Sequence, residues 1–287
     1  MMQISLASSS FFQALSTNPF LLFALAAGFA ASIASGIMGS FIVVKRIVFI
    51  SGSIAHSVLS GMGFFLWLRR TFNLEFITPL QGAIVAALLS ALLIGWVRAK
   101  YKEREDTIIA ALWSTGMAIG VIFVALTPGY NVELMNFLFG NILWVSYSDI
   151  ITLLILDVIV TAMTVLFYKR FQAVCFDEDQ AELQGISVNQ VYSLLLCMIA
   201  LSIVLLIQVV GSILVIAILA IPAAVAGNLT HRLSRMMLLA ILFSMAFTFA
   251  GTYISYECNW PPGATISLTA ALIYTVALLL KKRSAYR

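Results

Sequence analysis

One short stretch of the chain brings a histidine together with three serine hydroxyls. It contains Ser53, His56, Ser57 and Ser60. Their spacing of i, i+3, i+4 and i+7 predicts that all four share one face of an α-helix. Imidazole suits zinc, whereas manganese prefers oxygen ligands. We therefore interpret His56 and Ser53 as candidate ligands for a passing metal ion, and a neutral histidine bonded to a neighbouring helix is the alternative.

Few carboxylates are placed to contribute to such a site. Asp157 is the only one well inside an apolar stretch, "LLILDVIVTA", and ionisable groups in such segments usually mark a functional site. The alternative is a structural carboxylate bonded to a neighbouring serine, threonine or tyrosine. Glu133 and Glu257 are expected at the outer ends of helices, where each could collect cations or be a solvated surface acid. Asp157 and Glu257 join the candidate metal ligands.

The elements that position these residues are expected to span a membrane. Hydrophobic residues make up 62% of the 287 and charged residues 10%, against the roughly 25% charged residues of soluble domains. A span needs about 20 mostly apolar residues. Nine stretches qualify: 20–44, 47–68, 77–97, 107–127, 150–168, 192–208, 211–229, 236–256 and 263–280. We predict an all-α integral membrane bundle of about nine transmembrane helices, forming a single domain over residues 1–287. A tenth stretch, 132–145, is too short to cross and is expected to be re-entrant or interfacial.

The lysines and arginines predict how the bundle is oriented, because cytoplasmic loops are enriched in them. If the loop "RAKYKERED" at 98–106 is cytoplasmic, only Arg69 and Arg70 of the 16 basic residues fall outside. The N-terminus is then outside and the C-terminus inside. The net charge of +4 follows from these loops and does not indicate a nucleic-acid partner.

Small residues and a proline predict how the helices pack. Ala27, Ala31, Ser35 and Gly39 recur every four residues and form a ridge that lets a neighbouring backbone approach closely. Pro222 lies inside an apolar stretch and cannot donate a backbone hydrogen bond, so a kink or local unwinding is expected there. Such a kink is either a hinge or simply architecture.

The largest cytoplasmic loop, 169–190, is expected to contain a short helix. Asp177 with Gln180 forms a capping pattern and Gly185 is a natural helix stop, which predicts about two turns over 178–184. The loop also carries four acids that anionic headgroups would repel: Asp177, Glu178, Asp179 and Glu182. We interpret this segment as a docking surface for a soluble partner, with an interfacial helix as the alternative.

Several catalytic motifs are absent from the sequence. It contains no phosphate-binding G-x-x-x-x-G-K-[ST] loop, no H-E-x-x-H and no nucleophile elbow. The chain is therefore not expected to be an enzyme or to hydrolyse nucleotides itself. A bundle with a polar stripe and a partner-binding loop points to transport.

The chain resembles the permease subunit of bacterial ATP-binding-cassette importers for zinc, manganese and iron. The matching segments follow the family order: "GIMGSFIVVKRIVFISGSIAHSVLSGMG" (36–63), "ALWSTGMAIGVIF" (111–123), "LMNFLFGNIL" (134–143), "FDEDQAELQGISV" (176–188), "VVGSILVIAILAIPAAVA" (209–226) and "GTYISYECNWPPGATI" (251–266). The resemblance implies a multi-pass protein of the bacterial cytoplasmic membrane, in contact with lipid and paired with a second permease chain as a homodimer. It also implies a cytoplasmic ATPase dimer, which docks on the loop around Asp177, Glu178, Glu182 and Gly185, and an extracytoplasmic metal-binding protein.

One position departs from the family pattern and bears on the metal. Members often carry an aspartate four residues before the histidine, and this chain has Gly52 there. Loss of that carboxylate favours zinc as the transported ion, with manganese or iron as close variants, and no permanently bound cofactor is expected. Two further alternatives are a permease for a metal chelate such as a siderophore or cobalamin, and a secondary transporter with Asp157 as its proton site.

Overall fold

Every element in the described part of the chain is an α-helix, as expected. The computed structural model describes residues 11–101, 105–129, 137 and 145–284. The helices are α1 (Phe11–Thr17), α2 (Pro19–Lys45), α3 (Val48–Phe72), α4 (Pro79–Tyr101), α5 (Glu105–Leu126), α7 (Tyr147–Phe176), α8 (Glu178–Leu183), α9 (Val188–Leu229), α10 (Leu233–Cys258) and α11 (Pro262–Ser284). The short helix predicted at 132–145, and Glu133 with it, fall almost entirely outside the described residues.

Eight helices in the described ranges are long and apolar enough to cross a membrane. They are α2, α3, α4, α5, α7, the first part of α9 (Val188–Ser212), α10 and α11. The predicted span at 211–229 corresponds to a shorter apolar helix, Leu214–Leu229. The sequence prediction of a polytopic helical membrane protein is thus confirmed.

Local signals in the sequence set where several helices begin and end. The Asn18 side chain caps α2 by accepting a hydrogen bond from the Phe20 amide, and Pro19 occupies the first helical position. Ser146 and Asp149 form a capping box at the start of α7. That helix continues to Phe176, so the first part of the predicted loop 169–190 is helical, because nothing interrupts the backbone hydrogen bonds before Asp177.

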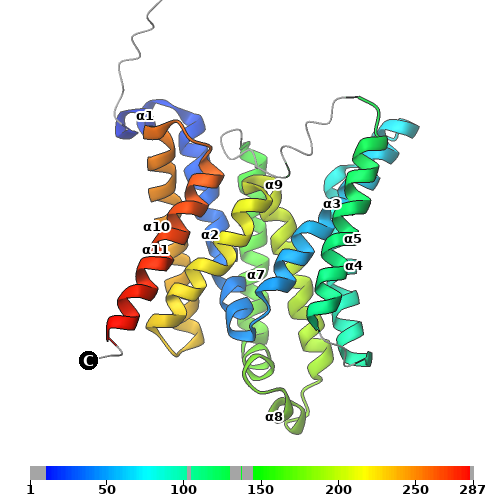
Figure 1. The fold of residues 1–287 in the computed structure, drawn as a ribbon, viewed down its shortest axis with the longest axis vertical. Helices are drawn as coiled ribbons and strands as arrows, with labels where there is room; N and C mark the ends of the chain where they lie inside the picture. Colours follow the sequence, from blue (N-terminus) through cyan, green and yellow to red (C-terminus); the bar gives the residue numbers. More distant parts are fainter. Residues whose placement is uncertain (1–10, 102–104, 130–136, 138–144, 285–287) are drawn as a thin grey trace, which may run out of the picture.

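α9 folds back on itself at Gly211. This residue has φ 80° and ψ 161°, a conformation that is essentially restricted to glycine. The start of α9 lies near the end of α2, where Lys45 approaches the Tyr192 ring, and the end of α9 lines a cavity together with Arg46. Both ends of α9 therefore lie at the same end of the molecule (Figure 1). The chain turns at Gly211, whereas Pro222 lies buried within the second half.

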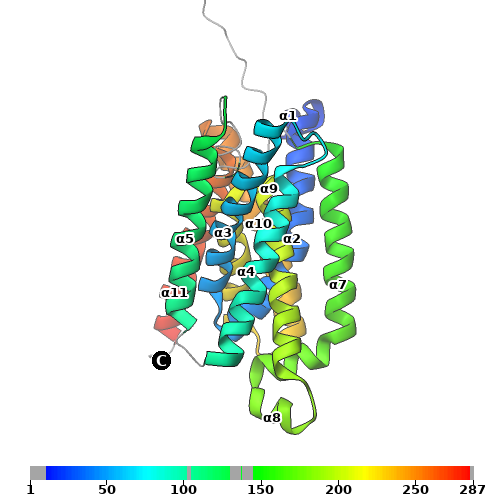
Figure 2. The same ribbon diagram turned by 90° about the vertical axis from the view of Figure 1, so that its right-hand side faces the viewer.

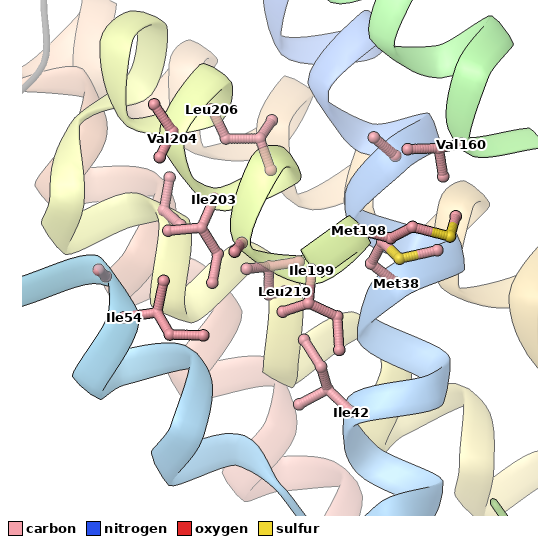
Figure 3. Close-up of a cluster of buried hydrophobic side chains, with 14 of the residues drawn as sticks. Met38, Ile42, Ile54, Val160, Met198, Ile199, Ile203, Val204, Leu206 and Leu219 are labelled. Atoms are coloured by element: carbon pink, nitrogen blue, oxygen red, sulfur yellow. The ribbon is translucent and has the colours of Figure 1, made fainter. Parts of the chain in front are cut away.

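α2 and α9 form the centre of the bundle. On one side α3 and α4 pack against α9, with α5 packed against α3, and α10 and α11 lie on the other side (Figures 1 and 2). The core contains buried apolar side chains from α2, α3, α7 and α9, including Met38, Ile54, Val160 and Ile199 (Figure 3). Large apolar side chains on the outer faces, such as Leu166 of α7, remain exposed, as expected for faces that meet lipid or another chain.

The small-residue ridge on α2 lies inside this centre. Ala27, Ala31 and Ser35 are completely buried. A Cβ added at Gly39 would collide with the Leu219 carbonyl oxygen of α9 and lie 3.4 Å from the Ala223 Cβ. The second half of α9 thus packs directly against the α2 backbone.

The distribution of basic residues agrees with the predicted orientation. Lys45 and Arg98, at the ends of α2 and α4, both contact Glu178 of α8, so these helix ends lie together with α8. Arg69 and Arg70 lie in the last turn of α3, which runs away from that end (Figure 1). The α8 end is therefore the cytoplasmic end.

Candidate functional site

The helix that carries His56 packs closely against α5. Two glycines on α5 permit this approach: a Cβ added at Gly116 would lie 2.6 Å from the Ser57 Cα, and one added at Gly120 would lie 2.6 Å from the Leu59 carbonyl carbon. Their spacing of four residues places both on one face of α5. The backbone of α3 is therefore in direct contact with α5 along the polar stripe.

The serine hydroxyls of the stripe hold this interface together. Ser53 Oγ donates to the Ile109 carbonyl at 3.0 Å, and Ser57 Oγ donates to the Leu112 carbonyl at 3.1 Å. Ser60 Oγ donates within α3, to the Ser57 carbonyl at 2.7 Å. Ser53 is completely buried. In this arrangement the candidate ligand Ser53 links α3 to α5.

His56 lies against an indole ring. Its imidazole stacks on Trp113 of α5, with the ring centroids 4.6 Å apart and the planes 18° from parallel, and the side chain is partly buried. A Cβ added at Gly52 would lie 3.1 Å from the same indole. Trp113 therefore covers both the histidine and the position at which the family often has an aspartate.

Sequence reasoning did not assign a role to Trp113. It occurs in the segment "ALWSTGMAIGVIF", one of those that resemble the family. The spacing of Gly116 and Gly120 in that segment is the signal that predicts a close helix contact. It does not indicate which neighbouring helix makes that contact.

The structure places Asp157 away from the polar stripe, between α7 and α2. One carboxylate oxygen accepts a hydrogen bond from the Ala34 amide at 3.0 Å, and the side chain is only 6% exposed. The other oxygen is buried and has no hydrogen-bond partner in the described part of the chain. Asp157 therefore contacts the α2 backbone at Ala34, next to Ser35 of the small-residue ridge.

The candidate metal ligands do not form one closed site. Glu257 lies exposed in the last turn of α10, beside Cys258. Among the described residues, no three His, Cys, Asp or Glu side chains lie close enough to share a metal ion. A cavity of about 230 Å³ borders the opposite face of α3, where Val58 and Met62 contribute to a mostly apolar wall.

The predicted short helix of the cytoplasmic loop is present as α8. The Asp177 side chain caps it by accepting a hydrogen bond from the Gln180 amide at 3.0 Å. Gly185 ends it with φ +78°, and its amide donates to the Glu182 carbonyl at 2.9 Å. Asp177 and Glu182 are exposed, and Leu183 has 89% of its side chain exposed, so α8 presents acidic and apolar groups outward.

Glu178 differs from the other acids of α8 because its carboxylate points into the bundle. It pairs with Lys45 of α2 and, at 2.5 and 2.7 Å, with Arg98 of α4. We refer to Lys45, Arg98 and Glu178 as the inner ion cluster. Burial raises the pKa of Glu178, but the hydrogen bonds and positive charges of Arg98 and Lys45 outweigh this effect and hold the pKa below its ordinary value.

Comparison with protein families supports one assignment over nearly the whole chain. Residues 17–281 match the ABC 3 transport family. A "probable metal transport system membrane protein" of Chlamydia pneumoniae is 48% identical over 257 residues, covering 90% of this chain and 87% of the relative. The manganese transport system membrane protein MntC of Listeria monocytogenes is 35% identical and covers 94% of this chain and 93% of its own.

A solved structure shares the arrangement of helices. It is described as PsaBC from Streptococcus pneumoniae in complex with Fab, and one of its chains superposes on this one with a TM-score of 0.81. The two chains are 30% identical, and the match covers 93% of this chain and 94% of the other.

Proposed function

This chain belongs to the ABC 3 transport family and is a multi-pass metal permease of the bacterial inner membrane, and from that premise we propose that its substrate is zinc. The observation that carries the proposal is the side-chain chemistry around His56. The imidazole is the one strong zinc ligand on the polar stripe of α3, and Gly52 supplies no carboxylate one turn before it.

A single imidazole suits transient binding of the metal. A closed structural zinc site has four protein ligands and holds its ion tightly. With His56 as the main ligand, and Ser53 contributing an oxygen when α3 and α5 separate, the ion would be held weakly and could leave. Glu257 and Asp157 are proposed as further contacts, at the outer entrance and within the bundle.

Manganese is the second candidate, and the names of relatives favour it. The Listeria monocytogenes relative is called a manganese transport system protein. Manganese prefers carboxylate and carbonyl oxygens, but the polar stripe has no carboxylate, and the Ile109 and Leu112 carbonyls beside it accept hydrogen bonds from Ser53 and Ser57. The chemistry of the site and the name of the relative therefore favour different metals, and the experiment below separates them.

The proposed partners follow from the family and from α8. The sequence has no phosphate-binding loop, so ATP hydrolysis belongs to a separate cytoplasmic subunit. We propose that this subunit docks on the outward groups of α8, including Asp177, Glu182 and Leu183. A second permease chain and an extracytoplasmic metal-binding protein complete the proposed complex.

The test is metal uptake by the reconstituted complex. The permease and its ATPase are placed in proteoliposomes with the binding protein, and ATP-dependent uptake of zinc and manganese is measured for the wild type and for His56→Ala. We expect zinc uptake that falls about tenfold in the variant, equivalent to about 1.4 kcal/mol of lost interaction.

His231→Ala is the matched control, since it removes the only other histidine, which is exposed at the cytoplasmic end. It should retain wild-type uptake. Uptake of manganese but not zinc by the wild type would refute zinc as the substrate. Zinc uptake that is indifferent to His56→Ala would instead remove His56 from the pathway.

A further inference from the structure

Five helices meet at the inner ion cluster. Lys45 is the last residue of α2, Arg98 lies in the last turn of α4, and Glu178 is the first residue of α8. Lys45 also donates to the Val174 carbonyl of α7 at 2.9 Å. The Arg98 guanidinium lies 4.0 Å from the centroid of the Tyr192 ring of α9. The cluster therefore joins α8 to four helices of the bundle.

The contacts are arranged so that one anion holds two cations. Both carboxylate oxygens of Glu178 contact Arg98 Nη2, and one of them also contacts Lys45. The side chains of Lys45, Arg98 and Glu178 are 14%, 22% and 30% exposed, so water screens them less than it screens surface pairs. The Tyr192 ring and the end of α7 provide further favourable contacts for the two cations.

We propose that the inner ion cluster transmits movement of α8 to the helices that carry the metal pathway. The proposal rests on the proposed function, in which an ATPase docks on α8. Glu178 is then a positioning residue: it does not contact the ATPase or the metal, but it makes α2 and α4 follow α8 when the ATPase moves it.

The packing of α4 extends this connection to His56. α4 crosses α3 with backbones in contact, because a Cβ at Gly61 would meet the Gly82 carbonyl and one at Gly82 would meet the Gly61 carbonyl. The backbones touch at this crossing, with the Phe65 ring and the Ala86 Cβ packed beside them, so movement of one helix there displaces the other. A displacement of Arg98 is therefore passed through α4 to the helix that carries His56.

The other acids of α8 make docking and transmission separable. Asp177 and Glu182 are exposed and available to a partner, whereas the Glu178 carboxylate is engaged within the chain. Loss of a docking group should weaken assembly with the ATPase. Loss of the Glu178 charge should leave assembly intact and reduce the metal moved per ATP hydrolysed.

The experiment compares Glu178→Gln, Arg98→Gln and the double variant in the reconstituted complex. Uptake of the metal that the wild type transports is measured together with ATP hydrolysis. The amount of ATPase subunit that co-purifies with the permease is measured separately. We expect each single variant to lower uptake per ATP by about fivefold or more, the lower end of typical coupling between sites. The double variant should lose no more than the worse single variant, because both changes break the same contact.

Lys100→Gln is the matched control for Arg98→Gln. It removes the same charge from the same end of α4, and Lys100 is exposed and lies outside the cluster. Lys100→Gln should retain the wild-type ratio of metal uptake to ATP hydrolysis. Arg98→Gln leaves the sequence of α8 unchanged, so it still tests the proposal if Glu178→Gln fails to fold.

Three results would overturn the proposal. The first is an unchanged ratio of uptake to hydrolysis in both single variants. The second is that the ATPase no longer co-purifies with the Glu178→Gln permease, while Arg98→Gln keeps wild-type co-purification and uptake per ATP. This result would make Glu178 a docking residue. The third is a double variant whose loss is the product of the two single losses. A wild-type complex without ATP-driven uptake would contradict the proposed function itself, and the inference would fall with it.

Discussion

The absence of a side chain at Gly52 determines what surrounds His56. Because there is no Cβ at this position, the Trp113 indole can lie over α3 and stack on the imidazole. An aspartate at position 52 would place a carboxylate one helical turn from the histidine, where both could bind one ion. We therefore expect the ligand set, and with it the preference for a metal, to depend on position 52.

Gly52→Asp is expected to shift uptake toward manganese. The new carboxylate supplies the hard oxygen ligand that manganese prefers, and the Trp113 indole must move by a few tenths of an ångström to admit its Cβ alone. The measurement is the ratio of manganese to zinc uptake in competition, with Gly52→Asn as a control of similar volume without the charge. An equal ratio in the two variants would show that position 52 does not select the metal.

At the scale of elements, two helix breaks depend on glycine. Gly211 turns α9 back on itself, and Gly185 ends α8. Both have positive φ values, which other residues rarely adopt. A Cβ at Gly185 would meet nothing within 4 Å, so the backbone conformation rather than the space around it limits substitution there.

Gly185→Pro is expected to uncouple transport. Proline fixes φ near −65° and cannot donate the amide hydrogen bond that Gly185 gives to Glu182, so α8 can no longer end in its present geometry. The measurement is the rate of ATP hydrolysis by the ATPase subunit with and without the permease. Gly185→Asn is the control, because asparagine tolerates the left-handed conformation and there is space for its side chain. Normal stimulation in Gly185→Pro would argue against a docking role for α8.

Gly211→Ala is expected to destabilise the permease by about 1–3 kcal/mol, the cost of holding a non-glycine residue in a sparsely populated conformation. The thermal stability of the detergent-solubilised protein is the measurement. Gly227→Ala is the matched control within the same helix, because a Cβ there meets only the flexible end of the Met236 side chain. Equal stability of the two variants would mean that the turn in α9 does not require glycine.

At the scale of the whole molecule, the basic residues and the course of the helices define an inner and an outer end. The inner end contains α8 and the inner ion cluster, and the outer end contains α1 and the junction of α10 with α11 (Figure 1). The outer end also contains Cys258, which is exposed, whereas Cys175 is buried near the inner end.

A membrane-impermeant maleimide is therefore expected to label intact cells through Cys258. Labelling should disappear in Cys258→Ser, and Cys175 should remain protected because it is buried. The measurement is the labelled fraction of the permease before and after permeabilisation of the inner membrane. Labelling of Cys258 only after permeabilisation would show that this end of the permease faces the cytoplasm and that the orientation is the reverse.

The sequence predicted the long helices because each has to bury about 20 apolar residues in lipid, a requirement that is local to the chain. It also placed Gly211 at a boundary between two spans. It did not predict the contact of Trp113 with His56 or the inward direction of Glu178. Both depend on which helices become neighbours, and Glu178 lies far along the chain from Lys45 and Arg98.

We expect the turn at Gly211 to affect how the chain enters the membrane during synthesis. No Asp, Glu, Lys or Arg occurs from Val188 to Leu229, and no polar loop separates the two halves. The second half, Leu214–Leu229, is about 24 Å long at 1.5 Å per residue, shorter than the roughly 30 Å hydrocarbon core. Because no hydrophilic segment has to be carried outward, both halves can leave the translocon together as one hairpin. The insertion machinery then need not recognise the short half by itself.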